Sequence, residues 1–233
     1  MNILCIIPAR SGSKGIKHKN IKLLAGKPLM AWSIEQAIKS KYHMRIIVST
    51  DSEEYQKIAI KYGAEAPFLR PSEISQDLST DIELIEHCLD YLEKEEEYIP
   101  DFIVQLRPTY PTRKVKILDE TIKLFIEQRE KGIDSLRTVI PIEKSPFKMY
   151  TLNENSLEPL FRNLGDMIEP YNQCRQNLPQ AYLHNGYIDI LNSNIVKNKM
   201  ISGDKIYGYV MSKDEYHDID SIEDFEIVEK LFE

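Results

Sequence analysis

The sequence predicts an α/β protein of three layers, in which helices cover both faces of a mostly parallel sheet. Along roughly the first 140 residues, short apolar runs alternate with longer amphipathic runs, the β-α-β-α order of a parallel sheet. The alternation stops where a stretch rich in Pro, Asn, Gln and Tyr begins. We therefore expect residues 1–233 to form a single domain, with a small lobe inserted at 141–185.

Short apolar runs predict the strands, and amphipathic runs between them predict the helices. The strands expected before the lobe are residues 3–8, 45–50, 66–69, 101–106 and 135–140. The helices expected between them are residues 28–40, 52–63, 82–96 and 114–131. Pro28 suits a first helical turn and Gly63 suits a helix end. The elements expected after the lobe are strands at 186–191 and 206–211 and a closing helix at 221–232.

The overall composition argues against several classes of protein. The 233 residues carry a formal net charge of −7, which disfavours a general nucleic-acid binder. The apolar runs are all much shorter than the roughly 18 residues that cross a membrane. Cys5, Cys88 and Cys174 form no C-x-x-C pair, which disfavours a disulfide framework or a zinc site. We expect a cytoplasmic protein that binds neither nucleic acid nor membranes.

The first loop after the first strand is basic although the chain is acidic. Residues 5–20 contain no acid, and their lysines and arginine are Arg10, Lys14, Lys17 and Lys19. Gly12 and Gly15 allow the backbone to turn and to point amide N–H groups at an anion. Ligands of parallel sheets bind beyond the carboxyl ends of the strands, where Asp51 and residues 107–113 are also expected. The loop therefore predicts a phosphate site, with a solvated basic turn as the alternative.

Two specific phosphate-binding motifs are missing from this loop. The P-loop pattern G-x-x-x-x-G-K-[ST] fails because Gly15 is followed by Ile16. The dinucleotide pattern G-x-G-x-x-G fails because the loop has only two glycines. A dehydrogenase or a P-loop NTPase is therefore a weak interpretation.

Near the end of the chain, Asp218-Ile219-Asp220 forms a D-x-D motif. Alternate residues of an extended segment point the same way, so we expect both carboxylates on one side. Mg²⁺ is commonly held by one or two carboxylates together with phosphate oxygens. The alternative is an exposed pair that caps the following helix.

Five segments, in order, carry a resemblance that covers nearly the whole chain. They are I-P-A-R-x-x-S-K-G with K-N at 7–20, LRPSEIS at 69–75, RPTYPTR at 107–113, QCRQNLPQAYLHNG at 173–186 and DIDSIEDF at 218–225. The sequence resembles the acylneuraminate cytidylyltransferase family, the synthetases of CMP-N-acetylneuraminate and of CMP-legionaminate and CMP-pseudaminate. The resemblance implies a Rossmann-like nucleotidyltransferase fold, CTP as donor, Mg²⁺ as cofactor, and a homodimer formed through the inserted lobe.

The resemblance also implies roles for individual residues. By match to the family motifs, the nucleotide-binding residues are Ala9, Arg10, Ser13, Lys14, Gly15, Lys19, Asn20 and Arg70. Of these, Asn20 and Arg70 match residues at the ribose and base. The metal is expected on Asp218 and Asp220, which together with Arg10 and Lys14 are the expected catalytic residues.

The acidic sugar is expected at a second set of residues, in which the sequence departs from the family pattern. These residues are Arg107, Lys148, Arg175, Asn185 and Asp189. Arg107 stands where the family usually has a glutamine that contacts the sugar, and Asp189 adds an acid where the family pattern has none. By match, Arg175 reaches the sugar site of the partner subunit. The departures concern the sugar and leave the nucleotide motif intact.

The implied reaction is attack of the anomeric hydroxyl of a nine-carbon acidic sugar on the α-phosphorus of CTP, with release of pyrophosphate. His184 and His217 are candidates for a general base by residue type alone. Two alternatives remain open: a cytidylyltransferase for another acidic sugar such as Kdo, and a non-catalytic nucleotide-binding protein.

Overall fold

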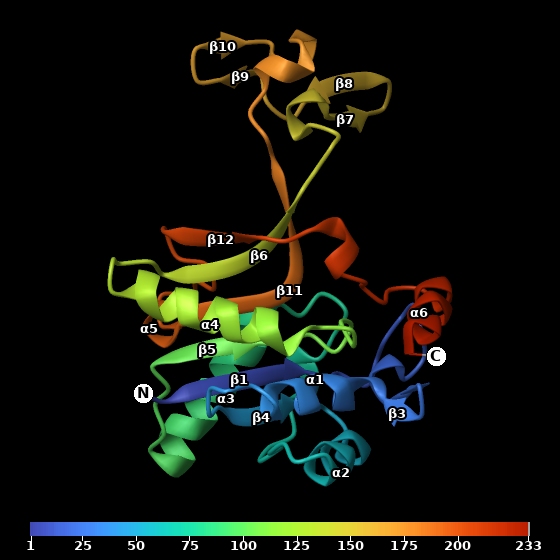
Figure 1. Ribbon diagram of the computed structural model, residues 1–233, viewed down its shortest axis with the longest axis vertical. Helices are drawn as coiled ribbons and strands as arrows, with labels where there is room; N and C mark the ends of the chain where they lie inside the picture. Colours follow the sequence, from blue (N-terminus) through green and yellow to red (C-terminus); the bar gives the residue numbers. More distant parts are fainter. Residues whose placement is uncertain (233) are drawn as a thin grey trace.

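A computed structural model describes residues 1–232, except for the side chain of residue 214, and contains a six-stranded central sheet (Figure 1). The strand order across the sheet is β12-β6-β11-β5-β1-β4. The bounds are β1 Ile3–Pro8, β4 Arg45–Ser49, β5 Phe102–Gln105, β6 Ser135–Pro141, β11 Tyr182–Asn192 and β12 Ile206–Val210. Strands β4, β1 and β5 pair in parallel, as do β6 and β12. Within this six-stranded sheet of the described chain, β11 is the one strand antiparallel to its neighbours, so the predicted mostly parallel sheet is confirmed.

Helices lie on both faces of the sheet. The α-helices are α1 Leu29–Ile38, α2 Glu53–Lys61, α3 Asp81–Glu96, α4 Val115–Arg129, α5 Ser193–Val196 and α6 Ile222–Glu229. Alternate residues of β1 enter two different cores. Ile3, Cys5 and Ile7 belong to the cluster that contains residues of α1 and α4. Leu4 and Ile6 belong to the cluster that contains residues of α3 and α5. This confirms the three-layer arrangement.

Short elements complete the body of the molecule. The two-residue strands β2 Leu23–Leu24 and β3 Lys27–Pro28 pair with each other. The 3-10 turns of the body are η1 Lys19–Ile21, η2 Ser72–Ile74, η6 Lys213–Glu215 and η7 Lys230–Phe232. Among the described residues, we find no helix whose length and apolar content suffice to span a membrane.

Several predicted boundaries differ from the structure. The strand predicted at 66–69 is wrong, because this segment has only a single parallel bridge at its edge, between Ile47 and Glu65. The carbonyl groups of Ala66 and Phe68 instead accept hydrogen bonds from the Gln56 side-chain amide, at 3.0 and 2.9 Å. The strand predicted from residue 186 begins at 182, and the closing helix changes to a 3-10 turn at 230.

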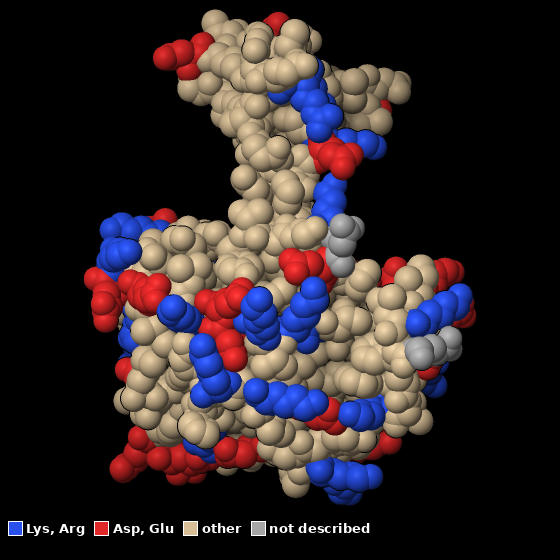
Figure 2. All heavy atoms as spheres, in the orientation of Figure 1, with Lys and Arg blue, Asp and Glu red and all other residues tan. Residues whose placement is uncertain are grey.

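The inserted segment lies away from the sheet, beyond the ends of β6 and β11 (Figure 1). Its elements are η3 Pro146–Lys148, β7 Tyr150–Asn153, β8 Ser156–Pro159, β9 Asn163–Leu164, β10 Met167–Ile168, η4 Pro170–Asn172 and η5 Arg175–Asn177. All four residues of β7 are exposed, and Leu152 and Leu157 expose 67% and 61% of their surface. On the visible face of this lobe, Lys, Arg, Asp and Glu form separate groups among other residues (Figure 2). Its apolar surface is therefore uncovered in the single chain.

A buried arginine holds the loop that follows β5. Arg113 is 3% exposed, and its guanidinium donates to the carbonyl groups of Tyr187 and Arg107 at 2.8 and 2.7 Å. It also donates to the side chains of Ser33 and Gln36 on α1, at 3.0 and 2.6 Å. One cation thereby links α1, β11 and the loop at 107–113.

We expect Arg113→Ala to lower the free energy of unfolding by about 3 kcal/mol or more, because several buried acceptors lose their donor at once. Urea denaturation measures this change. The control is Arg162→Ala, an exposed arginine of the lobe, which should change the free energy by less than about 0.5 kcal/mol. Equal effects of the two substitutions would contradict the role given to Arg113.

Candidate active site

A cavity of about 380 Å³ opens at the carboxyl ends of β1 and β5. The predicted nucleotide residues that line it are Arg10, Ser13, Lys14, Gly15, Lys19, Asn20 and Arg70. Asp220 and Arg107, from the metal and sugar predictions, line it too. Of the predicted nucleotide residues, only Ala9 does not line it, because it is fully buried under the loop. The fold thus gathers residues from both ends of the chain around one cavity.

The basic loop is fixed to the ends of neighbouring elements. The backbone N–H and hydroxyl of Ser11 donate to the Asp51 carboxylate, at 2.7 and 2.8 Å. The backbone N–H of Ala9 donates to the Ser49 carbonyl at 2.9 Å. The side-chain amide of Asn20 donates to the Arg10 carbonyl, also at 2.9 Å. Asn20 therefore has a role in the loop itself, besides the nucleotide contact predicted for it.

Two cations of the loop converge on one carboxylate. Arg10 Nη1 and Lys14 Nζ lie 2.7 and 2.8 Å from the two oxygens of Asp77. Their hydrogen bonds, first that of Lys14 and then that of Arg10, lower the pKa of Asp77. Sequence reasoning missed Asp77, because it lies far along the chain from residues 5–20. Its position shows that both cations can reach a single anionic group, so a phosphate bound by both cations would have to displace Asp77.

Arg70 adds a buried guanidinium to the same cavity. It is 5% exposed, and its Nη2 donates to the Ser49 carbonyl at 3.3 Å. Its buried Nε has no hydrogen-bond partner among the described residues. Burial lowers the pKa of this guanidinium, which nevertheless stays charged at neutral pH. Arg70 is therefore a cation with unused donor capacity at the cavity wall.

The two aspartates of the D-x-D motif have different surroundings. Asp220 has an exposed side chain on the cavity, with Oδ1 3.4 Å from Lys19 Nζ. Asp218 does not line the cavity, accepts a hydrogen bond from the Tyr110 hydroxyl at 2.7 Å, and has a pKa that burial raises. Residues 218–220 belong to no strand or helix, and Ile219 between the two aspartates is fully buried. The expectation that both carboxylates face one side stays a prediction.

The capping alternative for this motif is wrong. The N-terminus of α6 is capped by Ser221 and Asp224, whose side chains bond each other's backbone N–H groups. The carboxylates of Asp218 and Asp220 are therefore not needed to cap the helix.

The motif fits a divalent cation that shares its coordination with phosphate. Asp218 Oδ1 is buried and has no hydrogen-bond partner in the described part of the chain. Such an atom is costly unless a donor or a cation meets it. Among the side chains that the structure describes, no cluster of three or more Asp, Glu, His or Cys could hold a metal by itself. Mg²⁺ suits such a site, because it accepts few protein ligands and keeps phosphate oxygens and water.

The basic loop packs directly on the D-x-D motif. Ile16 and Ile219 belong to one buried cluster with residues of α6. A Cβ atom on Gly15 would lie 2.6 Å from the Asp220 carbonyl oxygen, whereas one on Gly12 would meet nothing within 4 Å. The structure therefore refines the prediction: Gly15 is needed for close approach to the motif, and Gly12 is not.

Among the predicted sugar residues, Arg107 alone lines the cavity. Asp189 lies behind it and pairs with it, and His184 pairs with Asp189 in turn. Asn185 is buried, and its side chain bonds to Thr138 and to the Tyr187 backbone N–H. Its amide is thus used inside the fold rather than at the cavity.

Lys148 and Arg175 are not brought to the cavity within one chain. Both lie in the lobe, where Lys148 Nζ donates to the Tyr171 carbonyl at 3.3 Å. Neither His184 nor His217 lines the cavity. The sequence analysis missed Tyr110 and Asp81, although Tyr110 stands inside the RPTYPTR segment and Asp81 immediately precedes the helix predicted at 82–96.

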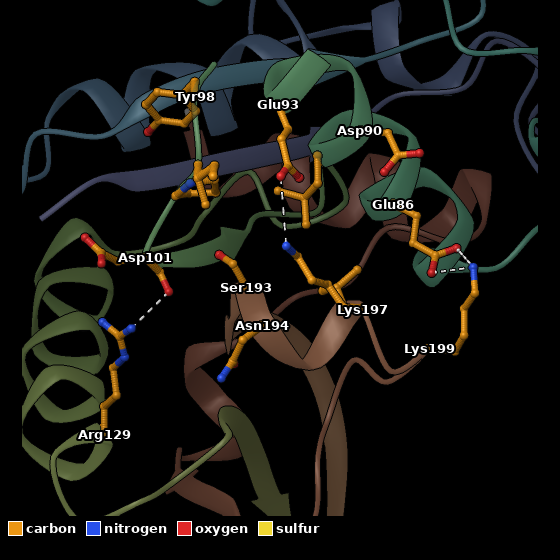
Figure 3. Close-up of a pocket in the computed structure, with 14 residues that line it drawn as sticks. Glu86, Asp90, Glu93, Tyr98, Asp101, Arg129, Ser193, Asn194, Lys197 and Lys199 are labelled. Atoms are coloured by element: carbon orange, nitrogen blue, oxygen red, sulfur yellow. Dashed lines mark hydrogen bonds and ion pairs between the residues drawn. The ribbon is translucent and has the colours of Figure 1, made fainter. Parts of the chain in front are cut away.

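A larger cavity of about 620 Å³ lies at the other end of the strands, where β5 begins and β11 ends (Figure 3). Its charges compensate one another, since Lys197 pairs with Glu93 at 4.0 Å and Lys199 with Glu86 at 2.7 Å. Arg129 donates to the Asp101 carbonyl at 3.2 Å. The smaller cavity, with its convergent cations, is the better candidate for anionic substrates.

The fold is that of nucleotidyltransferases. Over 100% of this chain, it superposes on 98% of a solved CMP:2-keto-3-deoxy-manno-octonic acid synthetase complexed with CTP, with a TM-score of 0.71 at 14% identity. A 4-diphosphocytidyl-2C-methyl-D-erythritol synthase from Anaerococcus prevotii superposes with a TM-score of 0.63 at 12% identity, over 99% of this chain and 98% of that one. At these identities the likeness concerns the fold alone.

Residues 4–198 match the cytidylyltransferase family, and the chain belongs to this family. It is 36% identical to the CMP-N,N'-diacetyllegionaminic acid synthase of Legionella pneumophila, over 100% of this chain and 97% of that one. It is 31% identical to the pseudaminic acid cytidylyltransferase of Campylobacter jejuni, with the same coverage.

The N-acylneuraminate cytidylyltransferase of Escherichia coli is 33% identical over 97% of this chain. This chain covers only 51% of that enzyme, so it spans about half the length of this relative. The resemblance inferred from five sequence segments is confirmed by these relatives together with the family match.

We expect Gly15→Ala to weaken CTP binding by about tenfold or more, because the new methyl group must push the loop away from the Asp220 carbonyl. Isothermal titration calorimetry with CTP and Mg²⁺ measures the affinity. Gly12→Ala is the matched control and should stay within about twofold of the unsubstituted protein. A stronger effect at Gly12 than at Gly15 would overturn this account of the loop.

Proposed function

We propose that this protein transfers CMP from CTP to the anomeric hydroxyl of a nine-carbon acidic sugar and releases pyrophosphate. The observation that carries the proposal is the cavity with cations at two places. Arg10, Lys14 and Lys19 stand at the basic loop, and Arg107 stands in the segment that follows β5. Each substrate brings negative charge, CTP on its phosphates and the sugar on its carboxylate, so two separate cationic positions suit the pair.

The chain's own residues supply binding and charge neutralisation at the phosphates. Arg10 and Lys14 take phosphate oxygens in place of Asp77 and stabilise the negative charge that develops on the leaving pyrophosphate. The close packing of Gly15 on Asp220 fixes the loop, so the α-phosphorus can be held in line with the attacking hydroxyl.

We further propose that Asp218 and Asp220 hold Mg²⁺ as cofactor. When bound, the ion supplies Lewis-acid neutralisation of phosphate oxygens. Support comes from the unpaired Asp218 Oδ1 and from the exposed carboxylate of Asp220 on the cavity. Lys19 bonds the Ile219 carbonyl at 2.7 Å, which keeps the segment between the two aspartates in place.

The acceptor is tested by incubation with CTP, Mg²⁺ and one acid at a time: N-acetylneuraminic, legionaminic or pseudaminic acid, or Kdo. Mass spectrometry should detect a CMP-sugar product for at least one nine-carbon acid. Product with Kdo alone would show the alternative acceptor, and CTP binding without product from any acid would show a non-catalytic nucleotide-binding protein.

Asp220→Asn should lower kcat by about two orders of magnitude or more while the protein stays folded, because a charged metal ligand is lost at an exposed position. Pyrophosphate release at saturating CTP measures the rate, and circular dichroism checks the fold. Glu223→Gln is the control, since this neighbouring acid is exposed on α6 and outside the cavity. Near-normal turnover in the Asp220 variant would exclude it as a metal ligand.

We also propose that the protein acts in the cytoplasm as a homodimer joined through its lobe. Burying the exposed leucines of β7 and β8 in a partner would remove apolar surface from water. Two chains related in this way could bring Arg175 of one lobe to the cavity of the other, which a single chain does not do.

Sedimentation velocity should show a dimer for the unsubstituted protein and a monomer for the double variant Leu152→Glu with Leu157→Glu, because charges cannot be buried unpaired in an interface. Ile60→Glu on α2 is the control, since Ile60 is similarly exposed, at 59%, and lies on the body. A fully active monomer would refute both the dimer and the cross-subunit role of Arg175.

A further inference from the structure

Arg107 is held between two carboxylates at the wall of the cavity. Its Nη1 lies 2.6 Å from Asp189 Oδ2, and its Nη2 lies 2.6 Å from Asp81 Oδ2. The two partners differ in burial, since the side chain of Asp189 is 6% exposed and that of Asp81 is 28% exposed. Asp81 lines the cavity and Asp189 does not. One carboxylate therefore lies behind the guanidinium, and the other lies at its open side.

The inner carboxylate is fixed by a second line of contacts. Asp189 Oδ1 lies 2.7 Å from His184 Nε2, and Arg137 Nη1 lies 3.2 Å from His184 Nδ1. Burial alone would raise the pKa of Asp189, but the His184 hydrogen bond and the Arg107 charge lower it to about 2. Asp189 is thus a permanent anion at neutral pH, and both of its oxygens have partners.

The backbone at Gly186 completes this support. Arg107 Nη1 donates to the Gly186 carbonyl at 3.1 Å. A Cβ atom at Gly186 would lie 2.8 Å from Arg107 Nη1, and the residue has a φ of +68°. Glycine is therefore required here both for the backbone conformation and for the close approach of the guanidinium. The contacts on the inner side of the Arg107 guanidinium therefore favour one orientation of this side chain.

The outer carboxylate lacks such support. Asp81 is the first residue of α3, but the capping box of that helix is made by Thr80 and Glu83. Its carboxylate is therefore not needed to satisfy the helix N-terminus. Two aspartates share the one Arg107 guanidinium, so these three side chains carry a net charge of −1, which the nearby Arg70 at the cavity wall offsets without replacing Arg107 as the hydrogen-bond partner of Asp81. A further carboxylate binds there only if Asp81 moves away, because like charges at such short range repel strongly.

We propose that Arg107 binds the carboxylate of the acidic sugar through Nη2, that Asp189 is a positioning residue that orients Arg107, and that Asp81 is a competing carboxylate which the sugar displaces. This inference rests on the proposed function and names the acceptor contact within it. The sugar exchanges one carboxylate–guanidinium pair for another, and Asp81 passes into solvent.

The inference predicts opposite effects for two substitutions that remove the same charge. Asp81→Asn removes the competitor, so KM for the acceptor acid should fall by about tenfold. Asp189→Asn releases Arg107 from its orientation, so KM for the acceptor should rise by about tenfold or more. KM for CTP should stay within about twofold in both variants. Asp90→Asn, at an exposed position of the same helix, is the control and should change neither KM.

A double-variant comparison tests whether Asp189 acts through Arg107. Arg107→Gln should raise the acceptor KM, and adding Asp189→Asn to it should have little further effect, because the residue to be oriented is gone. Circular dichroism and urea denaturation report whether each variant folds. If Asp189→Asn does not fold, Asp81→Asn still tests the inference, because Asp81 is partly exposed. A fall in the acceptor KM of this variant supports the displacement of Asp81 by the sugar, and an unchanged KM overturns it.

The kinetics use N-acetylneuraminic, legionaminic and pseudaminic acids as acceptors, each with CTP and Mg²⁺. A shift of the acceptor KM in the same direction in both aspartate variants, or no shift with Asp81→Asn, overturns the inference while the proposed function stands. Absence of product from the unsubstituted protein with all three acids overturns the proposed function and the inference together.

Discussion

The contact between the Gly15 backbone and the Asp220 carbonyl is the constraint on which the nucleotide side of the site depends. It brings the first loop of the chain against the segment that precedes the last α-helix, and the buried pair Ile16 and Ile219 maintains it. Without this packing, the sheet and helices would still place the cations of the loop at the cavity, but not the carboxylates of the D-x-D motif. The close packing brings the cations of the loop and the carboxylates of the D-x-D motif into one site. The charges of phosphate groups, cations and carboxylates can neutralise one another there.

The part of the cavity around Arg107 depends on how β11 pairs with β5. Because β11 runs antiparallel between β5 and β6, Asp189 pairs in register with Gln105, the last residue of β5. Arg107 follows two residues later and therefore reaches the Asp189 carboxylate. The register of β11 on β5 thus places the buried anion close to the arginine at the cavity.

Features that depend on local order could be predicted from the sequence. The apolar runs at 3–8 and 45–50 predict their strands from a few neighbouring residues, whereas the need for glycine at position 15 comes from its contact with the distant Asp220 carbonyl. The partners of the charged groups could not be predicted in this way, since Asp77 and Asp81 meet Arg10 and Arg107 only through the fold. The strand expected at 66–69 failed for a related reason: the Gln56 side chain takes up the carbonyl groups that a neighbouring strand would have used.

The pairing of Arg107 with Asp189 also limits how this scaffold can change during evolution or engineering. Replacing the arginine alone leaves a buried carboxylate without its counter-ion, at a cost of about 3–5 kcal/mol. Replacing the aspartate alone leaves a guanidinium whose inner side has lost its anionic partner. Both single steps pass through a weakened protein, so the two positions are expected to change together. With the role proposed for Arg107, acceptor preference would depend on a residue pair, and libraries that vary one position at a time would miss the functional combinations.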